Sequence, residues 1–233
     1  MTCEICNNEG FWFDEMGKMI VCTCRQKEIL NAKKESYGIT PRMAKQTLES
    51  FDLSFYTGNR KKAAQTALNA SREFIERCID GEEVEGMVFL GSVGSGKTYL
   101  ASAIIGKLIE NKVDAKIILL HDFMDELRAA VKDDSPQRLI NQVKSYKVLA
   151  IDDLGADNNT DFAISAVFSI LNYRINYELP TIITTNLSYK QIEEVYGSRV
   201  CSRITEMCRF YPLNGDKDIR LEKRLRVKNE QKR

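Results

Sequence analysis

The sequence lacks a large net charge, a long hydrophobic run and the features of a signal peptide. Its 34 lysines and arginines nearly balance its 33 aspartates and glutamates, so the net charge of +1 does not indicate a nucleic-acid partner and any basic surface must be local. The longest uncharged run, residues 162–173, is too short and too polar to span a bilayer. The N-terminus has neither the basic nor the apolar stretch of a signal peptide. We therefore expect a soluble, cytoplasmic protein with no membrane partner.

Histidine is nearly absent, and the sequence contains no internal repeat. The single histidine, His121, follows a predicted strand at residues 116–120, where a structural or capping role is favoured over catalysis. A length of 233 residues accommodates one α/β domain with a substantial core and a small appendage. In a reducing compartment, the seven cysteines are expected to be thiols or metal ligands rather than disulfides.

A glycine-rich motif at residues 91–98 carries the strongest chemical signal. Four apolar residues, 87–90, have the composition of a buried strand, Gly-Ser-Val-Gly-Ser-Gly-Lys-Thr follows, and a helical pattern extends to about residue 111. The glycines allow positive φ angles that bring backbone N–H groups close to phosphate oxygens, and the helix start favours the same anion. Lys97 can reach the β- and γ-phosphates, and the Thr98 hydroxyl can ligate Mg²⁺. We expect ATP or ADP to bind this loop through Gly91, Ser92, Val93, Gly94, Ser95, Gly96, Lys97, Thr98 and Tyr99.

Polar residues follow two further apolar strands, at residues 147–151 and 179–185. Asp152 would hold Mg²⁺, and Asp153 would orient and deprotonate the attacking water, although glutamate is commoner at the second place and aspartate is shorter by a methylene group. Asn186 can hold the lytic water or contact the γ-phosphate, the sensor 1 role. The alternatives are acids that cap a turn and an asparagine that only forms one. We expect the glycine loop and the acids to leave neighbouring parallel strands at the same edge of a sheet.

Four cysteines near the N-terminus, Cys3, Cys6, Cys22 and Cys24, frame a predicted hairpin. The hairpin would bring the two pairs together as four thiolates for a tetrahedral Zn²⁺, although the spacing of the second pair is tighter than in the usual zinc ribbon. So short a unit cannot bury enough surface to fold alone, and metal binding would supply the missing stability. Zinc is favoured over reduced thiols on a flexible arm and over a redox dithiol.

Other segments predict the surroundings of these motifs. Helices are predicted over residues 25–37 and 59–80, a further helix is predicted with Asp122 as its N-cap, and others are predicted to begin at Ser135 and at Asp161. Residues 208–212 predict a last strand, and the basic tail from residue 217 is expected to be frayed. An aromatic cluster, Phe51, Phe55 and Tyr56, either walls an adenine slot or packs in the core, and core packing is favoured.

Two arginines follow Ser188–Tyr196. Arg199 and Arg203 are four residues apart and share one face of a predicted helix. Either could reach the γ-phosphate bound by an adjacent subunit, as an arginine finger that implies a self-oligomer. A solvated helix face is the alternative.

Together these motifs resemble the DnaC/DnaI-type bacterial and phage helicase loaders of the initiator clade of AAA+ ATPases. The resemblance covers about residues 3–220. It rests on Cys-x₂-Cys…Cys-x-Cys-Arg25, Gly38-Ile-Thr-Pro-Arg, Thr47-x₃-Phe51-Asp, the glycine loop, Ile151-Asp-Asp-Leu-Gly155, Thr184-Thr-Asn186 and Gly197-Ser-Arg-Val-x₂-Arg203. It implies an α/β AAA+ P-loop NTPase domain with a five-stranded parallel sheet at residues 59–233, preceded by a zinc-binding module at residues 1–36 and a linker at residues 37–58. The stretch after Asn186 is too short for the helical lid of most AAA+ proteins, so the resemblance predicts a lidless domain in which Arg220 is the one candidate for sensor 2.

The resemblance also implies a function and residue roles. The expected protein is a Mg²⁺-dependent ATPase that binds a hexameric, DnaB-type replicative helicase through its zinc module and delivers it onto single-stranded DNA during replication initiation. By the same resemblance, Lys97, Thr98 and Asp152 bind phosphate and Mg²⁺, Asp153 is the base, Asn186 is sensor 1, and Arg203 is the finger with Arg199 beside it. The two helices between residues 122 and 144 match the clade's insert that contacts single strands, with Lys132, Arg138 and Lys144 as contacts or, alternatively, as a solvated face.

Two other functions remain open. An IstB-like transposition ATPase shares the core but acts with a transposase on duplex DNA, and the N-terminal cysteines argue against it. An ATP-gated adaptor would hold the nucleotide with little hydrolysis, and the aspartate at position 153 is consistent with this hypothesis.

Overall fold

A five-stranded sheet organises the computed structural model, which describes residues 3–131, 135–156, 160–215 and 218–230. Its strands are β3 (Gly86–Leu90), β4 (Ala115–Leu119), β5 (Val148–Leu154), β6 (Thr181–Thr185) and β7 (Cys208–Pro212). They run parallel in the order β4-β5-β6-β3-β7. The prediction of an α/β fold with a five-stranded parallel sheet is therefore confirmed. The sequence also predicted that β3, the strand of the glycine loop, and β5, the strand of the acids, are neighbours. This is wrong, because β6 lies between them.

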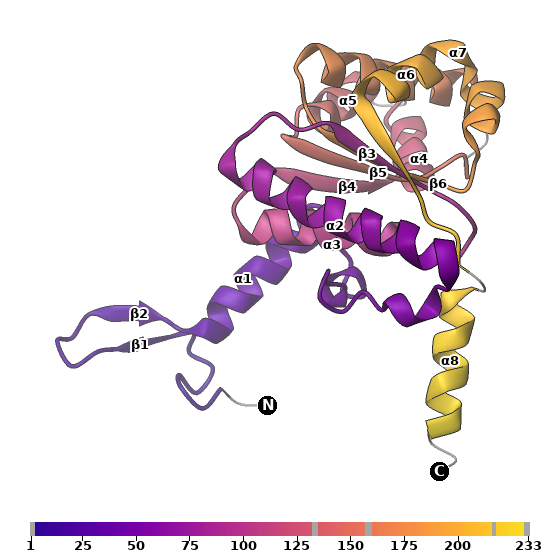
Figure 1. The fold of residues 1–233 in the computed structure, drawn as a ribbon. Helices are drawn as coiled ribbons and strands as arrows, with labels where there is room; N and C mark the ends of the chain where they lie inside the picture. Colours follow the sequence, from indigo (N-terminus) through magenta and orange to yellow (C-terminus); the bar gives the residue numbers. More distant parts are fainter. Residues whose placement is uncertain (1–2, 132–134, 157–159, 216–217, 231–233) are drawn as a thin grey trace.

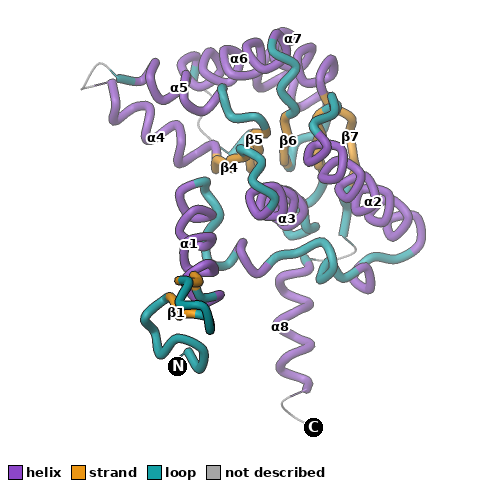
Figure 2. Tube along the Cα trace, turned by 90° about the vertical axis from the view of Figure 1, so that its left-hand side faces the viewer, coloured by secondary structure: helices purple, strands orange, loops and turns teal. Residues whose placement is uncertain are grey.

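Helices cover both faces of this sheet (Figures 1 and 2). One face carries α2 (Gly58–Asp80) and α3 (Lys97–Glu110), and the other carries α4 (Leu120–Ala130), α5 (Pro136–Lys144), α6 (Asp161–Asn176) and α7 (Tyr189–Met207). Side chains of β3 alternate between the two cores, since Met87 and Phe89 enter the first and Val88 the second. Strands buried on both faces need apolar residues at nearly every position, which explains the short apolar runs of the sequence.

Residues 37–58 pack against the first core rather than crossing solvent. Ile39, Leu48, Phe51 and Tyr56 are all buried in it, together with residues of α2 and α3. The Ile117 N–H donates to the Tyr37 carbonyl at 3.0 Å, so this segment adjoins the edge strand β4. Two short 3₁₀ turns, at Met43–Lys45 and Leu53–Phe55, complete the segment.

The N-terminal part extends away from the body (Figure 1). Strands β1 (Phe11–Phe13) and β2 (Met19–Val21) form the predicted antiparallel hairpin, and α1 (Thr23–Ser36) connects the hairpin to the body. The Lys34 ammonium of α1 binds the Glu110 carboxylate of α3 at 2.7 Å. This ion pair fixes the body-proximal end of α1.

Three local predictions are corrected. Helix α4 begins at Leu120, directly after β4, so Asp122 lies in its first turn and is not its N-cap. Strand β5 continues through both predicted acids to Leu154 instead of ending before them. The tail expected to be frayed forms a helix, α8, over Ile219–Glu230.

Within the described residues after Asn186, the structure forms α7, β7 and α8, and these do not make a separate helical lid. Among the described helices, none combines the length and apolar character that crossing a membrane requires.

Candidate nucleotide-binding site

A cleft of about 960 Å³ opens at the carboxyl ends of β3, β5 and β6. Open parallel sheets bind ligands at this edge. Its walls come from the glycine loop, from the segment that follows α1, and from α8 and the residue before it. The lining residues are Thr40, Arg42, Met43, Gln46, Val93, Gly94, Ser95, Gly96, Lys97, Thr98, Tyr99, Asp153, Asn186, Asp218, Ile219, Arg220, Leu221, Lys223 and Arg224.

The glycine loop has the backbone that an anion site needs. Gly94 and Gly96 have φ of 73° and 93°, conformations that side-chain-bearing residues adopt at a cost, and α3 begins immediately at Lys97. The Lys97 ammonium donates to the carbonyls of Gly91 at 2.8 Å and Ser92 at 2.7 Å. Burial lowers the pKa of Lys97, and the nearby Asp153 and Asp152 carboxylates oppose that shift. A buried ammonium held by neutral oxygens is well suited to accept phosphate oxygens in their place.

The two acids of β5 occupy different environments. Asp152 is only 3% exposed and accepts a hydrogen bond from the Thr184 hydroxyl at 2.6 Å. Burial raises the pKa of Asp152, while hydrogen bonds from the Thr184 and Thr98 hydroxyls lower it. The Asp152 carboxylate and the Thr98 hydroxyl therefore lie side by side as hard oxygen ligands, a pair that fits Mg²⁺.

A polar chain connects the second acid to the lysine. Asn186 donates through Nδ2 to the Asp153 carboxylate at 3.0 Å and accepts through Oδ1 from the Lys97 ammonium at 2.7 Å. Asp153 has φ of 61°, a left-handed backbone that aspartate tolerates better than most residues. The structure thus brings Lys97, Asp152, Asp153 and Asn186 to one place, where the amide and carboxylate can hold a water next to bound phosphate.

The aromatic residues Phe51, Phe55 and Tyr56 do not line the cleft. The Tyr56 hydroxyl donates to the Ser95 carbonyl at 2.6 Å, and Phe51 stacks on Tyr56 and contacts Tyr99 edge-to-face. Phe51 and Tyr56 are buried in the first core. These residues therefore pack in the core, as the favoured alternative predicted, and do not wall an adenine slot.

Apart from Arg220, the residues on the C-terminal side of the cleft were not predicted from the sequence. The Ser92 N–H donates to the Asn214 side chain at 3.2 Å, and the Ile219 N–H donates to the Gly94 carbonyl at 3.1 Å. Arg220 lines the cleft close enough to Lys97 for its charge to lower the pKa of that lysine. A tail read only as polar and basic gave no sign of this packing, because its partners are remote in the sequence.

The predicted arginine fingers lie elsewhere. Arg199 and Arg203 follow Gly197, where the backbone of α7 leaves helical geometry, and neither lines the cleft. Arg199 is exposed, and Arg203 binds the Glu206 carboxylate at 2.9 Å. Of the predicted DNA contacts, Arg138 is exposed on α5, the Lys144 ammonium lies 4.6 Å from the Tyr173 ring centre, and Lys132 falls outside the described residues.

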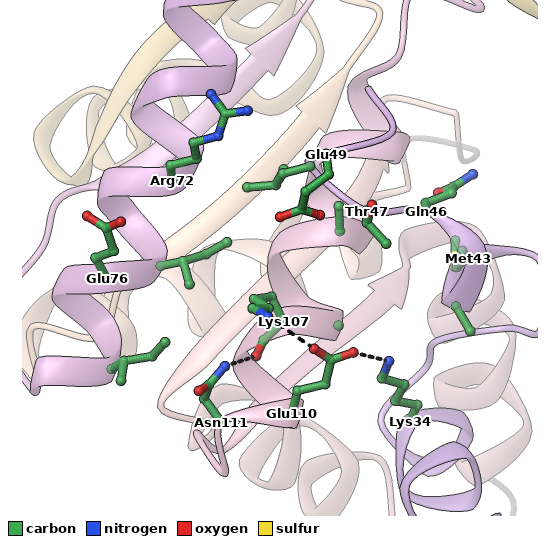
Figure 3. Close-up of a pocket in the computed structure, with 16 residues that line it drawn as sticks. Lys34, Met43, Gln46, Thr47, Glu49, Arg72, Glu76, Lys107, Glu110 and Asn111 are labelled. Atoms are coloured by element: carbon green, nitrogen blue, oxygen red, sulfur yellow. Dashed lines mark hydrogen bonds and ion pairs between the residues drawn. The ribbon is translucent and has the colours of Figure 1, made fainter. Parts of the chain in front are cut away.

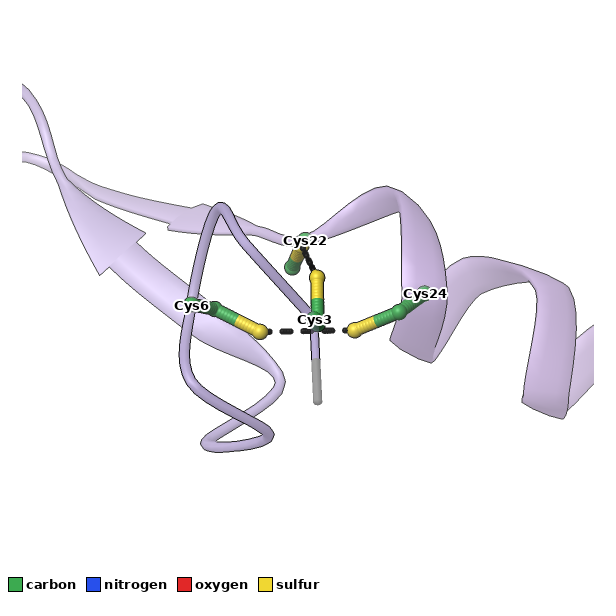
Figure 4. A group of neighbouring side chains, drawn as sticks. All are labelled: Cys3, Cys6, Cys22 and Cys24. Carbon is green, nitrogen blue, oxygen red and sulfur yellow. Dashed lines mark hydrogen bonds between the residues drawn. The ribbon is translucent and has the colours of Figure 1, made fainter. Parts of the chain in front are cut away.

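The four N-terminal cysteines form a compact cluster (Figure 4). Their sulfur atoms all lie within 4.8 Å of one another, with 3.7 Å between Cys3 and Cys22 and 3.4 Å between Cys6 and Cys24. A tetrahedral zinc with Zn–S bonds of about 2.3 Å places its sulfurs about 3.8 Å apart. Backbone N–H groups, first that of Cys6, lower the pKa of Cys3 to about 6, whereas hydrogen bonding to Cys6 and burial raise the pKa of Cys24 to about 12. Four cysteine sulfurs at this spacing fit a tetrahedral Zn²⁺, whose binding would displace the thiol protons.

A second cavity of about 330 Å³ lies between α2, α3 and residues 43–49 (Figure 3). Charged residues of both signs surround it, including the ion pair of Lys34 and Glu110. It shares Met43 and Gln46 with the rim of the nucleotide cleft. The segment that follows α1 therefore separates the two cavities.

Comparison with known families now identifies the class of protein. The family model described as "IstB-like ATP binding protein" matches residues 25–227. The chain belongs to this family.

Two related proteins and one solved structure show similarity to particular members of this group. The chain is 27% identical over 157 residues to the replicative helicase loader DnaI of Bacillus subtilis (strain 168), covering 62% of this chain and 50% of that protein. It is 31% identical over 206 residues to the uncharacterized protein YqaM of the same organism, covering 86% of this chain and 64% of YqaM. The crystal structure of the DnaC helicase loader superposes with a TM-score of 0.65 at 26% identity, over 75% of this chain and 99% of that one.

These comparisons confirm the resemblance to DnaC/DnaI-type loaders stated from the motifs. The chain spans 50% of the length of DnaI and 64% of the length of YqaM. The family match begins at residue 25, after the hairpin and the four cysteines.

Proposed function

We propose that this protein is an ATP-dependent helicase loader, which binds a hexameric replicative helicase of the DnaB type and delivers it onto single-stranded DNA during replication initiation. The observation that carries the proposal is the convergence of Lys97, Asp152, Asp153 and Asn186 at one cleft, in a chain similar to DnaI and DnaC. The fold forms the nucleotide site, and the similarity to the helicase loaders DnaI and DnaC supports helicase loading as the process in which the site acts.

The proposed hydrolysis assigns a task to each side chain. Bound Mg²⁺ would neutralise charge on the β- and γ-phosphates. Thr98 and Asp152 would hold that ion, and Lys97 would transfer hydrogen bonds from the carbonyls of its own loop to phosphate oxygens. Asp153 and Asn186 would orient the attacking water between them.

Two cations are candidates for stabilising charge on the γ-phosphate. Arg220 belongs to the same subunit's cleft and would act in the sensor 2 role. Arg199 and Arg203 lie away from that cleft, so an arginine finger from α7 would act on a neighbouring subunit and would require a self-oligomer.

The N-terminal module is the proposed attachment to the helicase. With zinc on Cys3, Cys6, Cys22 and Cys24, the hairpin would present side chains that the body does not cover, including Phe13 at 61% and Met16 at 92% exposure. Exposed apolar groups of this size commonly mark protein–protein contacts. Arg138 and Lys144 on α5 remain proposed contacts for single-stranded DNA.

The first experiment replaces the phosphate-binding lysine. Lys97→Ala should lower ATP hydrolysis about 10²-fold or more and abolish retention of the helicase on single-stranded DNA beads. The matched control is Lys107→Ala, at the other end of the same helix, where the lysine pairs with Glu110 and faces the second cavity. Unchanged helicase loading by Lys97→Ala would count against the mechanism.

An IstB-like transposition ATPase is the second candidate function, and the family match favours it. Such a protein would act with a transposase on duplex DNA. Co-purification with the cognate hexameric helicase supports the loader, whereas binding to a transposase and to duplex DNA supports the alternative. Phosphate release measured with helicase and DNA present separates both from an adaptor that holds ATP with little hydrolysis.

A further inference from the structure

A buried threonine, Thr184, joins the two acids of β5. It lies on β6, between the strands of the glycine loop and of the acids, and is 1% exposed. Its hydroxyl donates to the Asp152 carboxylate at 2.6 Å and accepts from the Asp153 backbone N–H at 2.9 Å. One side chain thus holds the carboxylate of the first acid and the backbone of the second.

The pairing of β5 with β6 explains why such a link is needed. Ile151 pairs with Ile183 and Leu154 with Thr185, so β5 has one more residue than β6 between these pairs. This irregularity is a β-bulge, which leaves a residue outside the ladder of backbone hydrogen bonds and redirects side chains. The Asp153 N–H, at the bulge, takes the Thr184 hydroxyl as its acceptor. A buried N–H without an acceptor would cost about 1–3 kcal/mol.

The bulge also sets the direction of the second acid. In a regular strand, successive side chains point to opposite faces of the sheet. Here Asp152 is buried beside Thr98, and Asp153, with its left-handed backbone, lies at the cleft and binds Asn186. The placement of both acids therefore depends on the bulge that Thr184 fastens.

We propose that Thr184 is a positioning residue for Mg²⁺-dependent nucleotide binding, because its hydroxyl orients the Asp152 carboxylate and fastens the bulge that carries Asp153. The inference rests on the proposed function, since it assumes that Asp152 and Thr98 hold the ion. The β-branched side chain of threonine restricts χ1, which keeps the hydroxyl between its two partners. Residues that orient metal ligands in this way typically change metal affinity 10–100-fold when they are replaced.

The next residue provides a matched control. Thr185 is 0% exposed, and its hydroxyl donates to the Leu154 carbonyl at 2.6 Å and accepts from the Leu187 N–H at 3.0 Å. Like Thr184, it donates one hydrogen bond and accepts one, but its partners are Leu154 of β5 and Leu187 rather than either acid. Thr185→Val removes as much hydrogen bonding as Thr184→Val and leaves the Asp152 carboxylate with its partner.

The test measures binding rather than turnover. Fluorescently labelled ADP is titrated into the full chain at a series of Mg²⁺ concentrations and in EDTA, for the wild type, Thr184→Val, Thr184→Ser and Thr185→Val. For Thr184→Val, the Mg²⁺ concentration at half-effect should rise about tenfold or more, while affinity in EDTA stays within about twofold. Thr184→Ser, which keeps the hydroxyl, should recover most of the Mg²⁺ response. Thr185→Val should keep the wild-type Mg²⁺ response even where its melting temperature falls.

The outcomes distinguish this inference from the function on which it rests. If ADP binding by the wild type is insensitive to Mg²⁺, the proposed catalytic function fails. If the wild type responds and Thr184→Val responds equally, or if Thr185→Val weakens the response as much as Thr184→Val, the positioning role is overturned. Should Thr184→Val not fold, Thr184→Ser decides, since a loss of its Mg²⁺ response at an unchanged melting temperature would contradict the role of the hydroxyl.

Discussion

The N-terminal module and the ATPase body are stabilised in different ways. In the body, two clusters of apolar side chains pack on opposite faces of the sheet. In the described part of the hairpin region, residues 3–22, the buried residues are Cys6 and Cys22, and most of the large apolar side chains are exposed. The body is therefore stabilised by hydrophobic burial, and we infer that the module, with little apolar burial, depends on a metal bound at its four clustered sulfurs.

Metal removal should have the largest effect on stability, and this effect should be confined to the module. A strong chelator, or Cys6→Ser, should unfold the hairpin, because structural zinc supplies about 10–16 kcal/mol to domains of this kind. Trp12, the one tryptophan in the sequence, lies on β1, so its fluorescence reports on the module alone. The melting temperature of the body should not change.

Cys78→Ser should give the opposite pattern. Cys78 is buried in the first core of the body, so its replacement should lower the melting temperature and leave the zinc content unchanged. A purified protein that contains no zinc, or Trp12 fluorescence that does not change with the chelator, would contradict the stabilisation of the module by a metal.

Replacement of a buried arginine should weaken the body next most. Arg174 is 0% exposed and donates to the carbonyls of Lys144, Tyr146 and Pro180 and to the Thr181 hydroxyl. Arg174→Met removes the donor of these four hydrogen bonds and should cost about 3 kcal/mol in unfolding free energy. Urea denaturation followed by circular dichroism measures the loss. Arg72→Met, at an exposed position on α2, should change stability by less than about 0.5 kcal/mol.

The junction of the two regions allows a finer test. Gly38 has φ of 89°, and a Cβ at this position would lie 2.0 Å from the Ile117 carbonyl oxygen. Gly38→Ala should therefore destabilise the contact between this segment and β4 by about 1–3 kcal/mol. Gly81→Ala, at the end of α2 in the body, has φ of 79° and no atom within 4 Å of the added carbon, so it measures the cost of the backbone alone. Equal losses in the two variants, by thermal denaturation, would show that the packing at the junction contributes nothing.

The ion pair between the regions should have the smallest effect. The Lys34 side chain is 8% exposed and its partner Glu110 is 38% exposed, so part of the interaction is screened by water. Lys34→Met should lower stability by about 1 kcal/mol or less, with less effect at high salt. Arg25→Met, which removes a more exposed pair with Glu28, should be neutral. A larger loss of stability for Arg25→Met than for Lys34→Met would contradict the role of the Lys34–Glu110 pair in connecting the module to the body.

Many features of the nucleotide site could be predicted from short segments. The glycine loop, the strand before it and the helix after it lie within residues 86–110, and the structure forms each of them close to the predicted bounds. Asp152, Asp153 and Asn186 were identified because each follows an apolar strand, and parallel strands end at one edge. Their chemical roles stay predictions.

Other features depend on contacts between remote segments. Nothing near Thr184 in the sequence shows that it faces both acids, because that depends on β6 lying next to β5 and on the bulge between them. Likewise, hydrogen bonds join Ser92 to Asn214, and Gly94 to Ile219 at the start of α8.

By itself the sequence determined the local conformations: a glycine loop that accepts positive φ, apolar runs long enough for buried strands, and two cysteine pairs on either side of a hairpin. These follow from the preferences of each residue and its near neighbours. Only the tertiary structure decided that β6 separates the loop from the acids, that residues 37–58 pack in the core and that α8 borders the cleft. The physical reason is that strand order and helix docking minimise the exposure of apolar surface over the whole chain, a sum to which every segment contributes.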